Sequence, residues 1–124
     1  MSMLSVRALM LLLSLEQPLR SGNFAAIYDR VRNAGVSQIP PDAGALESVC
    51  AAVDTACLWY LKQVLCLQRS AATVLLLRKQ GIPAQLVIGA SHMPFKAHAW
   101  VEVDGKVVND RSYMNEMYSV LDRC

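Results

Sequence analysis

Charge of either sign is scarce in this sequence. Charged residues make up 18% of the 124 residues, and 12 basic side chains are nearly balanced by 10 acidic ones. A protein that follows a phosphate backbone needs a clustered basic surface, and no stretch of the chain supplies one. We therefore expect no nucleic acid ligand. The high hydrophobic content, 54%, instead predicts an ordered domain with a large core.

Motifs for disulfides, metals and nucleotides are also missing. The four cysteines, Cys50, Cys57, Cys66 and Cys124, are too few and too irregularly spaced for a secreted disulfide framework. Cys50 and Cys57 would lie about 10 Å apart along one helix, beyond the roughly 7 Å limit for a bridge. There is no C-x-x-C or H-x-x-x-H pair and no G-x-x-x-x-G-K-[ST] loop. We expect four free thiols, a reducing compartment, and neither metal nor cofactor.

One apolar run near the N-terminus can be interpreted as a signal peptide or as a packed helix. Residues 8–15 read ALMLLLSL after Arg7, like the apolar region of a signal peptide. The run is shorter than the roughly 20 residues that span a bilayer, and EQPLR follows it in place of a small-x-small cleavage site. The sequence thus predicts a cytoplasmic protein without a membrane span, whose first helix packs on the domain or on a partner.

Apolar periodicity predicts four helices in the first two-thirds of the chain. Pro18 is expected to end the first helix and Gly35 the second, and Pro40 and Pro41 mark a linker. The fourth helix is apolar around most of its circumference, so it should lie at the centre of the fold. The spacing of the third predicts core positions at Cys50, Val53, Cys57 and Leu61. The predicted helices span residues 5–17, 23–34, 45–62 and 66–80.

The pattern changes to strands after Pro83. Residues 84–90 read as one strand, and residues 97–103 (AHAWVEV) alternate strictly before an Asp-Gly turn and a third strand at 106–110. Helices followed by an antiparallel sheet define an α+β fold. We expect one domain over residues 1–124, with a helical lobe at 1–62 and a central helix against a small antiparallel sheet at 63–124.

Two residues suit thiol chemistry, which needs a nucleophile and a base. Cys66 stands where the central helix begins, and the free N–H groups at a helix start favour an anionic sulfur. A buried structural cysteine is the alternative interpretation. His98 lies on the strand at 97–103, with Trp100 and Glu102 on its own face. A lone strand histidine is more often structural, so its partner decides its role.

The hairpin after His98 offers an acidic partner. If residues 103–105 form a three-residue loop with a bulge, Glu102 pairs with Lys106. The ladder then places His98 opposite Asp110, with Cβ atoms about 5 Å apart. This register predicts an imidazole–carboxylate couple.

A two-residue turn at Asp104 and Gly105 is the other possibility. It would move Asp110 to the opposite face and place Asn109 on the face of His98. Asn109 is therefore the reserve candidate for the third member of the site.

Several motifs together resemble a known family. They are CLQRSA at 66–71, LLLR at 75–78, GIPA at 81–84, LVIG at 86–89, HAWVEVDG at 98–105 and VLDR at 120–123. This combination is similar to the transglutaminase-like leader peptidases of lasso-peptide biosynthesis. The resemblance covers nearly half of the chain and implies a papain-like core with a catalytic triad of Cys66, His98 and Asp110.

The resemblance also implies an activity and partners. Such a cysteine peptidase cleaves the leader from a lasso-peptide precursor through an acyl-enzyme, with the Cys66 N–H and one further oxyanion donor, for which Gln63 and Trp59 are candidates. A separate leader-binding protein and an ATP-dependent macrolactam cyclase would complete the system, with residues 5–17 as the docking element. The alternatives are an acyltransferase or amidase on the same scaffold, and a non-catalytic scaffold of a peptide-maturation complex.

Overall fold

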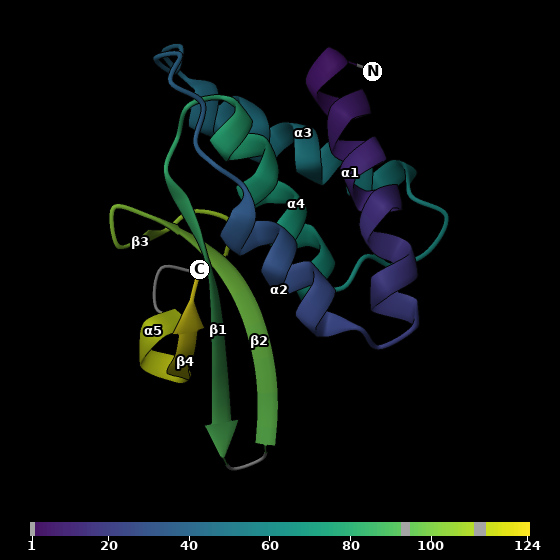
Figure 1. The fold of residues 1–124 in the computed structure, drawn as a ribbon, viewed down its shortest axis with the longest axis vertical. Coiled ribbons are helices and arrows are strands. Elements are labelled where there is room, and N and C mark those ends of the chain that lie inside the picture. Colours follow the sequence, from purple (N-terminus) through teal and green to yellow (C-terminus); the bar gives the residue numbers. More distant parts are fainter. Residues whose placement is uncertain (1, 93–94, 111–113) are drawn as a thin grey trace.

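The chain forms four long helices and then a small sheet. The computed structural model describes residues 2–92, 95–110 and 114–124. The expected α+β class is confirmed (Figure 1). In chain order the elements are α1 (Met3–Arg20), α2 (Phe24–Asn33), α3 (Ala45–Trp59), α4 (Cys66–Lys79), β1 (Ala84–His92), β2 (Phe95–Val103), β3 (Lys106–Val107), α5 (Met114–Met117) and β4 (Ser119–Arg123).

The sheet is antiparallel, with strand order β3-β2-β1-β4. The last strand of the chain therefore pairs with the first, and β3 and β4 form the two edges. Helix α4 packs on β1 and β2 and also on α1 and α3, so it lies between the sheet and the other helices (Figure 1). This is the central helix that the sequence predicts.

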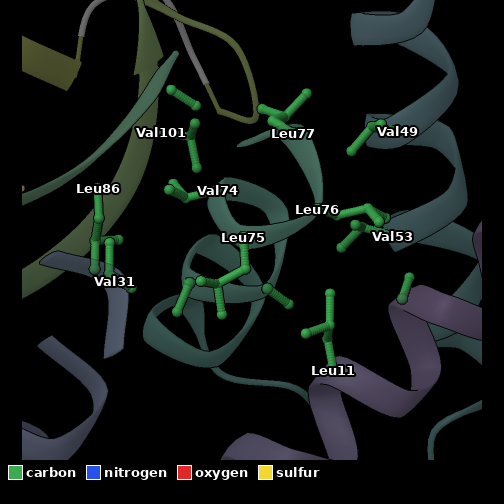
Figure 2. Packing of buried hydrophobic residues seen from close by; sticks show 14 of the residues in the cluster. Leu11, Val31, Val49, Val53, Val74, Leu75, Leu76, Leu77, Leu86 and Val101 are labelled. Carbon is green, nitrogen blue, oxygen red and sulfur yellow. The ribbon is translucent and has the colours of Figure 1, made fainter. Parts of the chain in front are cut away.

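The main core surrounds α4 (Figure 2). Leu76 and Leu77 are fully buried, and side chains from α1, α2, α3, β1 and β2 close around the helix. Burying one leucine stabilises a fold by about 1.5–3 kcal/mol, so these contacts fix the position of α4 strongly. The surrounding side chains include Leu11, Val31, Val49, Val53, Leu86 and Val101.

Two predicted helix ends are wrong. Helix α1 continues through Pro18 to Arg20, since a proline in the last turn removes one hydrogen bond while Leu19 still packs against the core. Helix α3 ends at Trp59, three residues early, because Tyr60 adopts an extended backbone. Leu61 therefore lies outside the helix and is 96% exposed, not part of the core.

Helix α1 has two apolar faces. The inner face includes Ala8, Leu11, Leu12 and Leu15 and is buried in the core. The outer face exposes apolar side chains at Met3, Val6, Met10 and Leu13. Within the described part of the chain, no helix combines the length and the apolar character that crossing a membrane requires.

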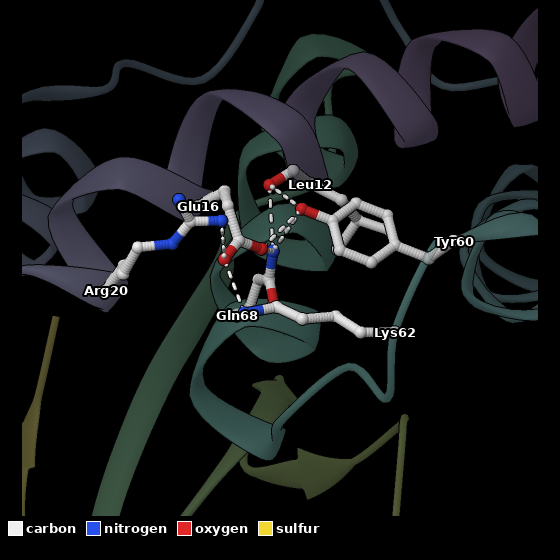
Figure 3. A network of polar contacts seen from close by, with 6 residues as sticks. All are labelled: Leu12, Glu16, Arg20, Tyr60, Lys62 and Gln68. Atoms are coloured by element: carbon white, nitrogen blue, oxygen red, sulfur yellow. Dashed lines mark hydrogen bonds and ion pairs between the residues drawn. The ribbon is translucent and has the colours of Figure 1, made fainter.

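A polar network ties α1 to the loop that precedes α4 (Figure 3). Glu16 of α1 pairs with Lys62 at 2.6 Å and accepts a hydrogen bond of 2.7 Å from the Tyr60 hydroxyl. The fully buried Gln68 of α4 donates to the Leu12 carbonyl at 2.8 Å. The bonds to Lys62 and Tyr60 hold the pKa of Glu16 at about 2, although its side chain is only 15% exposed.

This network predicts a pH dependence of stability. Folded Glu16 stays charged down to a pKa of about 2, against an ordinary value of 4.5, so its contribution is complete above about pH 4.5 and is lost as pH falls toward 2. Replacing Glu16 by Gln should flatten the urea-unfolding free energy across that window. The exposed Glu47, replaced in the same way, serves as control. Identical pH profiles for the wild type and Glu16→Gln would contradict the assignment.

Candidate active site

Cys66 is the first residue of α4. The preceding Leu65 is the N-cap residue, and its side chain makes no hydrogen bond to the first N–H groups of the helix. A sulfur at this position lies beside the positive end of the helix dipole, which favours an anion. Cys66 is half-buried and lines a pocket of about 390 Å³ together with His98 of β2.

His98 and Asp110 are in direct contact. His98 Nε2 donates to Asp110 Oδ2 at 2.7 Å, and the two side chains are 25% and 18% exposed. Nδ1, the other ring nitrogen of His98, takes no part in this bond. The hydrogen bonds found within the described residues include none between Cys66 and His98. Catalytic hydrogen bonds are often long before substrate binds, so a shared pocket is the relevant observation.

The prediction of a three-residue hairpin loop is wrong. Glu102 pairs with Val107 and Val103 with Lys106, so the turn contains only Asp104 and Gly105. Both turn residues have positive φ, 52° and 75°, as a type I′ turn requires. The twist of such a turn matches the twist of the strands, which explains why the shorter connection forms.

The predicted contact of His98 with Asp110 nevertheless forms, for a different reason. Strand β3 is only two residues long, and the chain bends at residues 108–110. The last hydrogen bond of the hairpin joins the Val108 N–H to the Val101 carbonyl at 3.0 Å. The regular strand pairing therefore ends before Asp110. The bend places the Asp110 carboxylate beside His98.

Asn109, the reserve candidate, has another role. Its Oδ1 accepts from the Val101 N–H at 2.8 Å, and its Nδ2 donates to Ser70 Oγ at 3.1 Å. Ser70 in turn donates to the Ala99 carbonyl at 3.1 Å. Asn109 thus joins β2 to α4 and holds the segment immediately before Asp110.

The pocket beside Cys66 and His98 is mostly apolar. Helix α2 contributes Phe24 and Tyr28, and burial raises the pKa of Tyr28, which keeps its hydroxyl neutral. The other lining side chains are Leu19, Leu65, Leu67, Ile88, Ala97 and Ala99. An apolar pocket next to a thiol suits a substrate side chain of similar character.

The remaining cysteines do not line this pocket. All four are free thiols, as expected, and burial raises the pKa of Cys50, Cys57 and Cys124. These three therefore stay protonated at neutral pH. Over residues 2–92, 95–110 and 114–124, no cluster of metal-binding side chains is found.

The two candidate oxyanion donors are not part of this pocket. Trp59 ends α3 and is 68% exposed, and Gln63 is exposed on the loop between α3 and α4. The lining of the pocket contains neither side chain. Cys66 lines the pocket and is the first residue of α4, so its own backbone N–H belongs to the free end of the helix.

The outer face of β2 carries an aromatic layer, formed by His98, Trp100 and Tyr118, which the sequence did not predict. Trp100 Nε1 donates to Glu102 Oε2 at 3.0 Å, and Arg123 of β4 contacts Glu102 Oε1 at 3.3 Å. The expected pair of Glu102 with Lys106 is therefore wrong, since the shorter turn places Val107 opposite Glu102. The ring of Tyr118 stacks on His98 with centroids 5.5 Å apart. No predicted element contained Tyr118, but Gly89 within a strand pattern was a usable signal of a close approach.

Comparison with known proteins agrees with this architecture. The transglutaminase-like superfamily pattern matches residues 9–123, so the chain belongs to that superfamily. The chain is also similar to the microcin J25-processing protein McjB of Escherichia coli, with 45% identity over 56 residues. That match covers 45% of this chain and 27% of McjB. No solved structure matches the chain significantly.

The role of Asn109 predicts a loss of stability on substitution. Asn109→Ala should lower the free energy of unfolding by about 1–3 kcal/mol, since the Val101 N–H loses its partner. Urea unfolding measures the change. Asn33→Ala, at an exposed position at the end of α2, should change it by less than about 0.5 kcal/mol. Equal effects of the two substitutions would contradict the structural role of Asn109.

Proposed function

We propose that this protein is a cysteine peptidase that removes the leader from a lasso-peptide precursor. Cys66 is the nucleophile, His98 the general base and acid, and Asp110 the group that orients His98. The observation that carries the proposal is the position of His98, which bonds to Asp110 and shares a pocket with Cys66 at the start of α4. Membership in the transglutaminase-like superfamily and the local identity to a microcin-processing protein support it.

The bond between His98 and Asp110 determines which ring atom acts. Because Nε2 is held by Asp110, Nδ1 of His98 takes the proton of Cys66. The sulfur attacks the carbonyl carbon of the last leader residue, and the positive end of α4 and the Cys66 N–H stabilise the developing oxyanion. His98 then returns the proton to the core amine as the C–N bond breaks.

Hydrolysis completes the cycle. The leader is now a thioester on Cys66, and His98 takes a proton from the attacking water. The C–S bond breaks, the proton returns from His98 to the sulfur, and the leader leaves as a carboxylic acid, which loses its own proton to water. Asp110 stabilises the imidazolium that forms in each step.

The apolar pocket is the proposed binding site for part of the substrate. Phe24 and Tyr28 from α2 and Ile88 from β1 line the pocket to which Cys66 also contributes, so an apolar side chain of the precursor beside the cleaved bond would pack there. The pocket can accommodate only a few residues of the precursor. Recognition of the remaining leader falls to a separate leader-binding protein, which raises the effective concentration of the bond at Cys66.

The outer face of α1 is the proposed docking element. The inner face of α1 is buried in the core, which leaves the exposed stripe of Met3, Val6, Met10 and Leu13 for a partner. An ATP-dependent cyclase would then close the macrolactam on the released core. We propose that the reaction takes place in the cytoplasm, and the free thiols support a reducing compartment.

Removing the nucleophile should abolish the activity and spare the fold. Cys66→Ala replaces a half-buried thiol by a small apolar side chain, so we expect no leader cleavage and an unchanged thermal transition. Mass spectrometry of a cognate precursor, incubated with enzyme and leader-binding protein, gives the products. Cys57→Ala is the matched control and should cleave normally. Normal cleavage by Cys66→Ala would end the proposal, and a product joined to an added amine would indicate an acyltransferase instead.

Changing the carboxylate should slow cleavage without stopping it. Asp110→Asn removes the charge that orients and stabilises the imidazolium, and we expect a loss of at least about tenfold in kcat. Asp104→Asn, in the exposed turn of the same hairpin, is the control and should leave kcat unchanged, since asparagine tolerates positive φ. A similar kcat for both variants would show that Asp110 has no part in the chemistry.

A further inference from the structure

We propose that Tyr118 and Gly89 are positioning residues for His98. Tyr118 restrains the plane of the imidazole by stacking on it, and Gly89 provides the space through which the tyrosine ring reaches the histidine. The inference rests on the proposed function of His98 as the base. It adds a second constraint on the ring, from the C-terminal part of the chain.

The stacking geometry is direct. The rings of Tyr118 and His98 lie 5.5 Å apart at their centroids with an interplanar angle of 20°. Trp100 lies beside both, 6.3 Å from His98 and 6.0 Å from Tyr118. Parallel aromatic rings at such distances attract each other, and the attraction grows when one ring becomes a cation. Tyr118 therefore stacks on one face of the His98 imidazole, which becomes a cation when it takes the proton in the proposed mechanism.

Gly89 explains how this contact is possible. It lies on β1, opposite His98 of β2 on one side and Val120 of β4 on the other. Tyr118 immediately precedes β4, so its ring must cross β1 to reach β2, a distance of about two strand spacings. A Cβ on residue 89 would lie 2.6 Å and 2.8 Å from ring carbons of Trp100 and 2.9 Å from Cβ of Tyr118. Only glycine leaves room at this position for both the Trp100 ring and the base of the Tyr118 side chain.

The tyrosine is itself held in place by its neighbours. The Tyr118 N–H donates to the Met114 carbonyl at 3.1 Å, and Met114 is buried against Trp100. At the other end of β4, Arg123 bonds to Glu102, the acceptor of the Trp100 indole. The aromatic layer is therefore fixed from two sides, and it transmits the position of β4 to His98.

A second constraint is needed because one hydrogen bond fixes only one ring atom. The bond from Nε2 to Asp110 allows the imidazole to rotate about the line of that bond. Rotation would move Nδ1 away from the pocket that contains Cys66. Stacking against Tyr118 opposes the rotation, so both nitrogens keep their directions. A misplacement of about 1 Å at a reacting group can cost about a hundredfold in rate.

The test uses four variants of the full chain. Tyr118→Leu removes the aromatic face and Tyr118→Phe keeps it, because the proposal involves the ring and not the hydroxyl. Gly89→Ala introduces the clashing Cβ, and Gly35→Ala is its control, since a Cβ at Gly35 meets no atom within 4 Å. Each variant is first checked for a thermal unfolding transition. If Tyr118→Leu has none, Tyr118→Met replaces it.

Two readouts separate positioning from stability. The first is the Nε2–H proton of His98 in imidazole 1H–15N NMR spectra, which are simple because the chain has only two histidines and His92→Asn assigns them. The second is kcat and KM for cleavage of the precursor. We expect Tyr118→Leu and Gly89→Ala to lose the sharp Nε2–H signal and to lower kcat by about tenfold, with KM within about twofold. Tyr118→Phe and Gly35→Ala should retain both properties.

Opposite results would overturn the inference. Retention of the signal and of kcat in Tyr118→Leu and Gly89→Ala would show that Asp110 alone orients His98. An equal loss in Tyr118→Phe and Tyr118→Leu would show that the hydroxyl, and not the stacked ring, matters. If the wild type does not cleave the precursor, the proposed function fails, while the NMR comparison still decides whether Tyr118 and Gly89 hold the ring.

Discussion

The enclosure of α4 is the constraint on which the rest of the structure depends. Ten of its fourteen residues are buried, including the charged Arg78. Arg78 is tolerated because its guanidinium donates to the carbonyls of Val31, Ala34 and Ala84. A helix held on all sides cannot shift along its axis without breaking many contacts at once. Its first residue, Cys66, therefore has a defined place relative to the sheet, and the network around Glu16 fixes the loop that leads to it.

The other half of the candidate site depends on the sheet. His98 lies on β2, whose inner face packs on α4 through Ala99 and Val101 and whose outer face carries the aromatic layer. Asn109 joins this strand to α4 at Ser70, one turn after Cys66. The same hydrogen bonds thus set the distance between helix and strand and the position of Asp110. Core packing and the geometry proposed for catalysis are properties of the same contacts.

The sequence predicted the N-terminal helices, the central helix and the antiparallel sheet, because each rests on apolar periodicity or on strong signals such as Gly81 and Pro83. The predicted ends of α1 and α3 were wrong, because they depend on tertiary contacts that no local pattern contains. Leu19 packs against the core, and the Tyr60 hydroxyl bonds to Glu16. The contact of His98 with Asp110 was predicted correctly from an incorrect register. Strand β3 is too short for ladder counting to reach Asp110, and the bend after it depends on hydrogen bonds to Val101 and Ser70. The stacking of Tyr118 on His98 was not predicted either, since the two residues lie twenty positions apart and meet across β1, and Gly89 signals only a close approach and not its partner.

The most direct test of the account is to identify the intermediate on Cys66. Precursor, leader-binding protein and enzyme are mixed, quenched in acid within the first turnovers, and analysed by intact-mass and peptide-mapping mass spectrometry. The account predicts a transient species with the mass of enzyme plus leader minus one water, mapped to Cys66, which decays as free leader appears. Leader release with the adduct on Cys50, Cys57 or Cys124, or undiminished release by enzyme whose Cys66 has been blocked with iodoacetamide, would contradict it.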